Sequence, residues 1–485
     1  MTSVVPHLRE NKAVRKKTLA ACKKRGIRIP TYSQLRDPSS LPKALVDRIR
    51  KTDMQAIDPA NLFRITWKND PNTGGFGKVN RLEIPREITG TRARIVGLVG
   101  KHFPTGAHKV GAAYGCLVPR LVSGEFDPTT QRAVWPSTGN YCRGGAFDSA
   151  ILGCTAVAIL PEGMSKERFA WLKSIGAEVI ATPGTESNVK EIYDKCWDIR
   201  KNRKDCVIFN QFDEMGNHLW HYGVTGPAIQ EVLEEMGKGL RAAGFLSATG
   251  SAGTIGAGDF LKEKHPHLRI GAVEALQCPT LLMNGFGEHR IEGIGDKHVP
   301  WVHNVRNTDN VIAVDDEDTI AGIRLFNEPA GQKVLKDEGV SSKVLEHLPL
   351  LGISGICNLL ASIKMARWYE LSEKDVVFTI FTDSISLYGS RLKELTSERG
   401  KYSEKEAFRD LEKVFRGANT AWMQELGYWD RKRIHNLKYY TWVEQQGKDS
   451  KDLNALWEPQ TWNEIHALLP DWEKAIDDFN KDSGV

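Results

Sequence analysis

The chain has 485 residues, and its length and composition exclude several classes of protein. Hydrophobic residues make up 41% of it and charged residues 26%, a balance typical of globular proteins with an apolar core. The formal charge of +5 comes from 66 basic and 61 acidic residues, too even a balance to indicate a nucleic-acid-binding surface. A chain of this length exceeds what one simple core supports, so we expect two or three domains.

The hydropathy and cysteine patterns predict a cytoplasmic protein. We expect no transmembrane segment and no signal peptide, because no run of 18 apolar residues occurs and the first residues are not apolar enough. The eight cysteines are scattered without a CxxC pair, so neither a disulfide framework nor a zinc site is expected. We therefore expect no metal, no membrane partner and no nucleic-acid partner.

Residues 1–60 are polar and interrupted by Pro30, Pro42 and Pro59, which predicts an N-terminal extension of short helices. Basic residues cluster between positions 12 and 28. A solvated helical arm is the simpler interpretation of that cluster, and a binding patch is the alternative. The segment 68–77 is rich in Asn, Asp and Gly, and we expect it to form a loop.

From about residue 92, short β-rich runs alternate with helical stretches such as 166–176. The β-rich runs lie at 93–99, 133–135, 156–160, 178–181, 207–209, 270–273 and 376–381. This alternation predicts an α/β fold with two parallel sheets, and we assign residues 61–395 to that core.

After about residue 395 we expect no further strands. The stretch 404–485 is charged and rich in tryptophan, which predicts a helical C-terminal extension, residues 396–485, packed on the core. A packing surface is favoured over a ligand cage for its six tryptophans: Trp422, Trp429, Trp442, Trp457, Trp462 and Trp472.

Lys109 is the strongest candidate for a reactive residue. It ends the segment Thr-Gly-Ala-His-Lys at 105–109, between the apolar run 93–99 and the small residues at 110–113. A strand that ends in a tight glycine turn and opens a helix would hold the amine at a helix N-terminus, partly desolvated and near bound anions. A lysine in that position can form a Schiff base with an aldehyde cofactor.

A glycine-rich segment at 249–258 predicts an anion site. It follows the apolar Phe245 and Leu246 and precedes a helical stretch at 259–264, so its backbone amides would face a phosphate. A dinucleotide fold is one alternative, because Glu274 lies near the ribose-binding position, but the spacing is GxxGxxGxG rather than GxGxxG. The other alternative is a turn without a ligand, in which the glycines only allow neighbouring segments to pack closely.

Polar residues between an apolar run and a helical stretch form a candidate carboxylate receptor. Their hydroxyls, amide and backbone N–H groups would face the ligand: Ser137, Thr138, Gly139, Asn140 and Tyr141. An ordinary helix N-cap explains the same pattern equally well.

A second polar strand end lies at Asp383 and Ser384, after the buried run 378–382. Ligands of open α/β sheets lie beyond the carboxyl ends of the strands, where Ser384 would be a neutral hydrogen-bond partner. Asp383 would orient Ser384 or act as a structural cap. A plain turn explains the segment when it is considered alone.

In this order the segments resemble the fold-type II pyridoxal-phosphate (PLP) enzymes, the superfamily of tryptophan synthase β, cysteine synthase and cystathionine β-synthase. Segment 105–109 is similar to their Schiff-base lysine motif, 137–141 to a Thr-Ser-Gly-Asn-Thr loop and 250–254 to a Gly-Thr-Gly-Gly-Thr phosphate loop. Asp383 and Ser384 resemble the end of a Pro-Asp-Ser motif.

Three further segments, at 210–212, 221–227 and 289–300, resemble the cysteine synthase and cystathionine β-synthase family in particular. The resemblance covers about residues 60–395. It implies two α/β subdomains with PLP in the cleft between them, the smaller and mobile one at about 130–220, and a homodimer.

The resemblance also implies roles for the residues. Lys109 would carry PLP and remove the α-proton of the substrate, Asn140 would meet the ring hydroxyl, and Ser384 would meet the pyridine nitrogen. The substrate carboxylate would bind at 137–141. The phosphate would be held by the glycine-rich loop: Gly250, Ser251, Ala252, Gly253 and Thr254.

The chain departs from the family pattern at positions 137, 138 and 141. Serine and threonine are exchanged at the first two, and Tyr141 replaces a small hydroxyl residue, which predicts a reshaped substrate pocket. The glutamate-bearing loop of tryptophan synthase is absent, which argues against indole chemistry. The regulatory domains and haem-binding segment of some cystathionine β-synthases are not evident.

These patterns predict a PLP-dependent lyase or transferase that performs β-elimination or β-replacement through an aminoacrylate intermediate. Its substrate would be a cysteine-, O-acetylserine- or serine-like amino acid, with a thiol or sulfide as a possible co-substrate. A serine/threonine dehydratase-type deaminase and a non-catalytic ligand-binding protein on this scaffold remain the alternatives.

Several other residues have ordinary explanations. His108 is equally compatible with stacking near the cofactor phosphate and with a structural role. Cys142 and Cys154 are expected to be small core residues, because no basic partner is evident near them. Glu292 is interpreted as a solvated charge.

Overall fold

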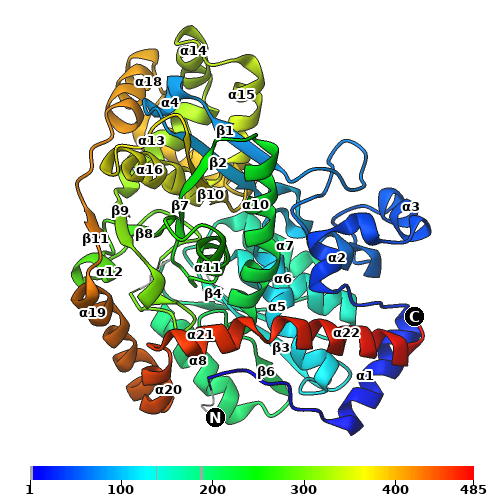
Figure 1. Ribbon diagram of the computed structural model, residues 1–485. Coiled ribbons are helices and arrows are strands. Elements are labelled where there is room, and N and C mark those ends of the chain that lie inside the picture. The colour runs from blue at the N-terminus through cyan, green and yellow to red at the C-terminus, as the bar shows by residue number, and fades with distance from the viewer. Residues whose placement is uncertain (1–3, 138, 186–188, 296) are drawn as a thin grey trace.

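The computed structural model describes residues 4–137, 139–185, 189–295 and 297–485, which form two β-sheets surrounded by helices (Figure 1). Within these residues the larger sheet has the strand order β1-β2-β10-β7-β8-β9-β11 and the smaller sheet β5-β4-β3-β6. The smaller sheet is parallel throughout, and the larger is parallel except at its two edge strands. The predicted α/β fold with two parallel sheets is therefore confirmed.

The strands of the larger sheet are β1 (Arg81–Ile84), β2 (Arg94–Val99), β7 (Arg241–Ala248), β8 (Arg269–Ala275), β9 (Asn310–Val314), β10 (Asp375–Phe381) and β11 (Met423–Glu425). Those of the smaller sheet are β3 (Arg132–Pro136), β4 (Ala156–Pro161), β5 (Glu178–Thr182) and β6 (Cys206–Ile208). The central strands β4 and β10 are buried along their whole length, as expected where helices cover both faces of a parallel sheet.

Three neighbouring strands of the larger sheet end at one edge and position the site. β10 pairs in parallel with β2 on one side and with β7 on the other. The chain leaves β2 toward Lys109, β10 toward Asp383 and β7 toward the glycine-rich loop 249–254. Since parallel strands finish at the same edge, these three segments converge there.

The helices that follow these strands pack closely against one another. α5 (Lys109–Ser123) packs on α6 (Asn140–Leu152) and α9 (Met215–Trp220). Where α5 meets α9, a Cβ on Gly216 would lie 2.1 Å from the carbonyl oxygen of Gly115, so neither helix could approach the other with a larger residue. The glycines thus set the position of α9 beside the site.

The remaining helices of the core cover the two sheets. They are α4 (Arg86–Thr89), α7 (Lys166–Ser174), α8 (Val189–Asn202), α10 (Gly226–Glu235), α11 (Ile255–Lys264), α12 (Thr280–Met283), α13 (Asp316–Asn327), α14 (Pro329–Asp337), α15 (Ser342–His347), α16 (Ile353–Trp368) and α17 (Gly389–Arg399). The apolar α16 lies against β10 and β7, and it covers one face of the larger sheet.

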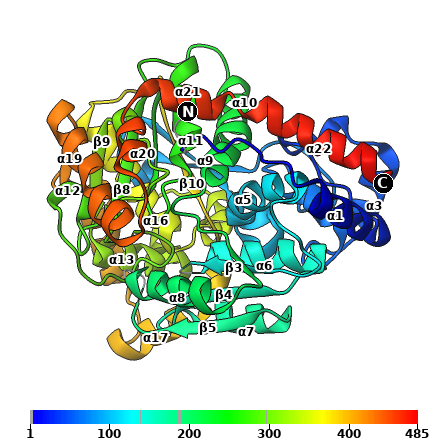
Figure 2. The ribbon, with the colours of Figure 1, turned by 90° about the horizontal axis from the view of Figure 1, so that it is seen from below.

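The segments before residue 60 and after residue 395 are mainly helical. The first contains α1 (Lys12–Arg25), α2 (Tyr32–Arg36) and α3 (Lys43–Lys51), and the last contains α18 (Glu404–Asp410), α19 (Tyr428–Lys438), α20 (Ser450–Ala455), α21 (Pro459–His466) and α22 (Leu469–Ser483). Figure 2 shows α22 running alongside α5 to meet α1. The Asn480 amide joins the two segments, since it accepts from the Ile29 N–H (3.0 Å) and donates to the Ile29 carbonyl (2.7 Å).

The C-terminal segment departs from the sequence prediction in two respects. The expectation that strands stop near residue 395 is wrong, because β11 pairs antiparallel with β9 at the edge of the larger sheet. Its three residues, Met-Gln-Glu, have no β-branched side chain, so only the pairing with β9 defines the strand. Trp442, Trp457, Trp462 and Trp472 are buried as predicted, whereas Trp422 and Trp429 are exposed.

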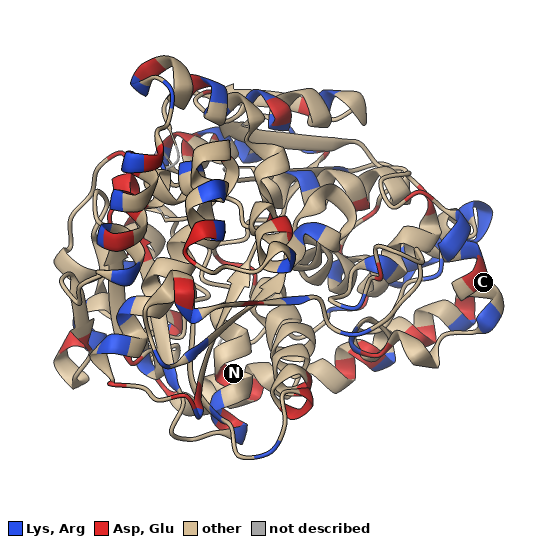
Figure 3. Cartoon of the chain, turned by 90° about the horizontal axis from the view of Figure 1, so that it is seen from above, with Lys and Arg blue, Asp and Glu red and all other residues tan. Residues whose placement is uncertain are grey.

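Basic and acidic residues both occur on many of the helices (Figure 3). Among the described residues, no single helix has both the length and the apolar composition needed to cross a membrane. One bent pair, Ser342–Leu350 with Ile353–Trp368, satisfies those two criteria together across a bend of 118°.

Candidate active site

Lys109 is the first residue of α5 and follows a sharp turn. Thr105 and Gly106 both adopt positive φ angles, 67° and 75°, which reverse the chain between β2 and the helix. The lysine side chain is half-buried, and desolvation lowers the pKa of its amine to about 8. A substantial fraction of neutral, nucleophilic amine is therefore present near neutral pH.

The Lys109 amine lies against the glycine-rich loop. Its Nζ donates a hydrogen bond to Ser251 Oγ (3.0 Å), which also accepts one from Asn217 Nδ2 (3.0 Å). A Cβ on Gly253 would lie 2.1 Å from Asn217 Oδ1, so the loop can pass this side chain only because residue 253 is glycine. The tertiary structure therefore brings Lys109 and the loop together.

The remaining residues of the glycine-rich loop lead into the start of a helix. Ala252 has a φ of 59°, a left-handed conformation uncommon outside glycine, and Thr254 Oγ1 donates to Ser247 Oγ (2.9 Å). The helix α11 begins at the next residue, Ile255. Backbone N–H groups at such a start favour an anion, particularly a phosphate.

A hydrogen-bond network joins the two sheets across the cleft. Asn140, the first residue of α6, donates from Nδ2 to Asp383 Oδ2 (2.6 Å), and the Tyr388 hydroxyl donates to the same oxygen (2.6 Å). Arg168 Nη2 donates to the Tyr388 hydroxyl (2.9 Å). Burial raises the pKa of the Asp383 carboxyl, against the lowering effect of its hydrogen bonds with Tyr388 and Asn140.

A buried charge cluster adjoins this network, and sequence reasoning missed it. Glu292 lies between Arg168 (3.1 Å) and Arg391 (2.5 Å), with Arg168 and Glu292 almost completely inaccessible. The interpretation of Glu292 as a solvated charge is therefore wrong. Burial and the nearby charge of Arg168 lower the pKa of Arg143 to about 10.

Sequence reasoning missed two arginines, Arg143 and Arg168. They differ in whether a local sequence pattern could have indicated them. Arg143 lies one helical turn after Gly139, close enough to the polar segment to be considered with it. Arg168 offers no local signal, because its partners are far away in the sequence. A Cβ on Gly139, whose φ is 154°, would lie 2.6 Å from Arg168 Nη1, which places that arginine directly under the polar segment.

The predicted carboxylate receptor is partly engaged in local contacts. Ser137 Oγ accepts a hydrogen bond from the Gly139 N–H (3.0 Å), and the Tyr141 hydroxyl donates to the Phe209 carbonyl (3.2 Å). The Tyr141 ring packs edge-on against Trp135, at 5.5 Å, so its contacts lie in the core of the smaller sheet. Thr138 lies outside the described residues.

The contacts at the end of β10 differ from the expected arrangement. Ser384 Oγ lies 2.8 Å from Ser386 Oγ, which accepts from Lys101 Nζ (2.8 Å). The carboxylate of Asp383 instead binds Asn140 and the Tyr388 hydroxyl, so it connects the subdomains rather than orienting Ser384.

Other sequence candidates have structural roles. Glu274 is buried and accepts from the backbone N–H groups of Leu281 (2.8 Å) and Leu282 (2.9 Å), which leaves no support for a ribose-binding role. Cys142 and Cys154 are buried, and desolvation raises the pKa of both thiols to about 12, as expected of core cysteines. His108 is buried and stacks on Trp67 at 5.5 Å.

The family model for pyridoxal-phosphate dependent enzymes matches residues 100–383. The chain belongs to this family. The match begins just after β2 and ends at Asp383, so it contains Lys109, the polar segment 137–141 and the glycine-rich loop. The predicted cofactor, PLP, is thereby confirmed as the cofactor of the family.

Curated relatives refine this assignment. A probable cysteine synthase of Bacillus subtilis is 31% identical over 286 residues, which span 59% of this chain and 85% of that protein. A cystathionine beta-synthase of Saccharomyces cerevisiae is 28% identical over 325 residues, 63% of this chain and 59% of that protein. The predicted relation to these two groups of PLP enzymes is therefore confirmed.

Solved structures share the fold. A hydrogen sulfide-producing enzyme of Fusobacterium nucleatum superposes with a TM-score of 0.55 at 25% identity and covers 72% of this chain and 93% of that one. A cysteine synthase of Entamoeba histolytica superposes with a TM-score of 0.57 at 22% identity, over 70% and 93% of the two chains. The second likeness concerns the fold alone.

The residues in the cleft fit PLP. Lys109 supplies an amine for its aldehyde, and the loop before α11 supplies backbone N–H groups for its phosphate. Within the described residues, Asn140 Oδ1, Asn217 Oδ1 and Asp383 Oδ1 are buried without a hydrogen-bond partner. Buried polar atoms are normally paired, and Asn140 Oδ1 is available to a polar ligand, whereas Asn217 Oδ1 faces Gly253 and Asp383 Oδ1 faces Gly352.

Proposed function

We propose that this PLP-dependent enzyme performs β-replacement or β-elimination on a cysteine-, O-acetylserine- or serine-like amino acid. The observation that carries the proposal is the convergence of Lys109, the loop containing Ser251 and the Asn140–Asp383 contact at one cleft. The curated relatives named cysteine synthase and cystathionine beta-synthase support this reaction class. A thiol or sulfide would be the co-substrate for replacement.

The proposed cofactor site uses residues from five segments of the chain. Lys109 holds the aldehyde carbon, and the phosphate is held by the loop before α11: Gly250, Ser251, Ala252, Gly253 and Thr254. Asn217 supports this loop through Ser251. Asn140 Oδ1 and the Ser384 hydroxyl provide neutral partners for the ring. Bound PLP supplies an electron sink for negative charge at the substrate α-carbon.

Lys109 is proposed as the base that removes the α-proton. Its amine must be neutral to accept a proton, and a pKa of about 8 supplies that form closer to neutral pH than an ordinary lysine. The helix start at Lys109 and the glycine turn before it hold the amine at the cleft. Ser384 offers a hydroxyl rather than a carboxylate, so it adds no negative charge at the ring nitrogen.

The substrate carboxylate is proposed to bind at the start of α6. Backbone N–H groups of residues 137–141 would form this receptor, whereas the Tyr141 side chain is held in the core of the smaller sheet. The buried guanidinium group of Arg143 adds positive charge near it, which favours an anion there, whereas the charge of Arg168 is compensated by Glu292. Closure of the smaller subdomain over the substrate would exclude water from the reacting atoms.

The organisation of the chain is part of this proposal. Residues 1–60 and 396–485 are extensions of a catalytic core at 61–395, whose smaller subdomain at about 130–220 moves relative to the larger. β5 and β6 are largely only half-buried, which supports such mobility, because a segment with few buried contacts separates from its neighbours at a low free-energy cost. We further propose a cytoplasmic homodimer without membrane or nucleic-acid partners.

The proposal is tested by supplying the purified holoenzyme with cysteine, O-acetylserine or serine, each with and without sulfide or homocysteine. A new thiol or thioether product establishes replacement, and pyruvate with ammonia from cysteine or O-acetylserine establishes elimination. Pyruvate from serine alone would instead identify a serine dehydratase. A protein without lysine-linked cofactor absorbance, and without a lysine labelled after borohydride reduction, would be a binding protein and would overturn the proposal.

A further inference from the structure

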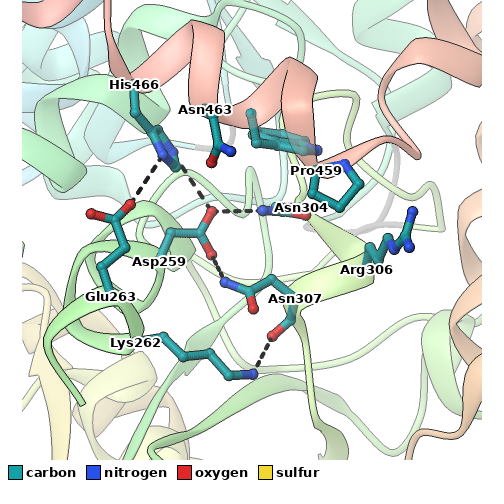
Figure 4. Close-up of a pocket in the computed structure, with 10 residues that line it drawn as sticks. Asp259, Lys262, Glu263, Asn304, Arg306, Asn307, Pro459, Asn463 and His466 are labelled. Carbon is teal, nitrogen blue, oxygen red and sulfur yellow. Dashed lines mark hydrogen bonds and ion pairs between the residues drawn. The ribbon is translucent and has the colours of Figure 1, made fainter. Parts of the chain in front are cut away.

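Two histidines and an aspartate from three helices meet where the C-terminal segment packs on the core. The Nε2 atoms of His218 (α9) and His466 (α21) lie 3.0 Å apart. Asp259 Oδ2 (α11) lies 3.5 Å from the first and 3.8 Å from the second. All three side chains are buried, and Figure 4 shows His466 and Asp259 turned toward each other.

We propose that His218, Asp259 and His466 bind one divalent transition-metal ion of the zinc class. Zinc lies about 2.0–2.2 Å from histidine nitrogen and carboxylate oxygen, which separates adjacent ligand atoms of a tetrahedral site by roughly 3.3 Å. The three observed separations bracket that value. An ion about 2.1 Å from all three atoms fits above their plane without movement of the chain.

Asp259 has the outer partners that a metal site requires. The side-chain amides of Asn304 (2.8 Å) and Asn307 (2.7 Å) donate to the two oxygens of Asp259 and hold its carboxylate in place. Each carboxylate oxygen still has a lone pair for a metal.

The second nitrogen of His466 is oriented in the same way. Its Nδ1 lies 3.5 Å from Glu263 Oε1 (Figure 4), and the Tyr222 hydroxyl donates to the other oxygen of that carboxylate at 2.8 Å. A carboxylate on the far nitrogen of a histidine fixes the ring and its tautomer, so that Nε2 is available to a metal.

The ligand set determines the class of metal. Two imidazole nitrogens and one carboxylate suit zinc and neighbouring divalent ions better than calcium or magnesium, which prefer oxygen, or copper(I), which prefers sulfur. A cavity of about 360 Å³ adjoins Asp259 and His466 and is lined also by Asn463 and Trp462. It leaves room for a water molecule as the fourth ligand.

Such an ion would link the C-terminal segment to the helix that follows the glycine-rich loop. His466 belongs to α21, whereas Asp259 lies on the helix that begins directly after the loop residue Thr254. His218 follows Asn217, whose side chain binds Ser251 in that loop. The site therefore predicts that metal binding stabilises the packing of residues 459–466 against the core.

The test uses the full-length, untagged, PLP-loaded protein, stripped with a chelator and dialysed against Zn²⁺ alone. We expect one bound ion per chain by elemental analysis, and slower proteolysis of the C-terminal segment when the ion is present. Asp259→Asn and His466→Gln should each weaken binding more than tenfold, because each removes a ligand. Glu263→Gln should weaken it by about tenfold, since it loosens only the orientation of His466.

Two further variants keep the result interpretable. His267→Gln changes an exposed histidine and should leave the stoichiometry at one. His466→Cys, which supplies a sulfur ligand, should restore binding lost in His466→Gln, and retained cofactor absorbance reports the fold of each variant. Binding by the parent that equals binding by Asp259→Asn, or no binding at all, would reduce the cluster to a hydrogen bond between the two rings and overturn the proposal.

Discussion

Two desolvated lysines in different regions of the molecule have lowered pKa values but very different surroundings. Burial lowers the pKa of Lys109 in the cleft to about 8 and that of Lys438, in the C-terminal segment, to about 7. Lys438 Nζ donates to the carbonyls of Trp301 (3.0 Å) and His303 (2.7 Å), whereas Lys109 Nζ contacts the hydroxyl of Ser251.

The two lysines show that a lowered pKa does not by itself identify a reactive residue. Two carbonyls hold the Lys438 amine inside a packed interface, where it links α19 to the segment around Trp301. The Lys109 amine lies at a helix start and donates to Ser251, which also accepts a hydrogen bond from Asn217. Desolvation thus makes both amines more easily neutral, but only Lys109 has a site around it.

The largest expected effect comes from exchanging the two lysines for apolar residues. Lys109→Ala should abolish the lysine-linked cofactor absorbance and lower turnover by at least about 10²–10⁴-fold, because it removes the proposed base. Lys438→Met should retain both signals. Borohydride reduction followed by peptide mass analysis identifies the lysine that carries the cofactor. Cofactor found on Lys438 would show that Lys438, rather than Lys109, is the reactive lysine.

The charge cluster of the cleft should contribute more to stability than charges at the surface of the C-terminal segment. Glu292→Gln leaves Arg168 buried beside a neutral group, and removing one member of a buried ion pair costs about 3–5 kcal/mol. Denaturant unfolding measures the loss. Glu458→Gln, which removes the exposed partner of Arg306, is the matched control and should have little effect. Equal losses would show that Glu292 is solvated in solution.

A smaller effect is expected from a substitution that disturbs the close packing of the glycine-rich loop. Gly253→Ala places a Cβ 2.1 Å from Asn217 Oδ1, and such overpacking costs about 1–3 kcal/mol. We expect weaker PLP binding, measured by equilibrium titration of the stripped enzyme. Gly77→Ala, where the nearest atom to the new Cβ is 3.6 Å away, should bind PLP like the parent. Unchanged affinity in Gly253→Ala would show that the loop relaxes.

The two lysines should also differ in the pH dependence that they produce. Only a neutral amine attacks an aldehyde, so the rate of PLP attachment to the stripped enzyme should rise with pH and level off above about 8, the pKa of Lys109. Stopped-flow absorbance measures this rate. Lys438→Met should show the same profile, and a rise that continues toward pH 10 would indicate an unperturbed Lys109.

Lys438 should instead affect stability. Its folded pKa, about 7, lies below its ordinary value of 10.5, so the unfolded chain binds the additional proton between these pH values. The free energy of unfolding of the parent, relative to Lys438→Met, should therefore increase as the pH rises from about 7 toward 10.5. Parallel stability curves for the two proteins would show that Lys438 is not desolvated.

Much of the fold and part of the site could be predicted from local sequence patterns. The alternation of β-rich runs and helices is enough to indicate parallel sheets, because each element is specified by neighbouring residues. Lys109 and the loop at 250–254 could be singled out as candidates for the same reason, since a glycine turn before a helix is encoded within a few positions. Their meeting at one cleft follows from the order β2-β10-β7.

Other features were decided only by the tertiary structure. The charge pairs of Glu292 join segments 99 or more positions apart, and His218 meets His466 across 248 positions. β11 exists because β9 offers a free edge, not because of its own three residues. The cysteine pattern gave no reason to expect a metal, yet packing of α21 on α9 and α11 brings three ligand-type side chains together. Local backbone preferences extend over one or two turns, so contacts between distant helices emerge only when the whole core packs.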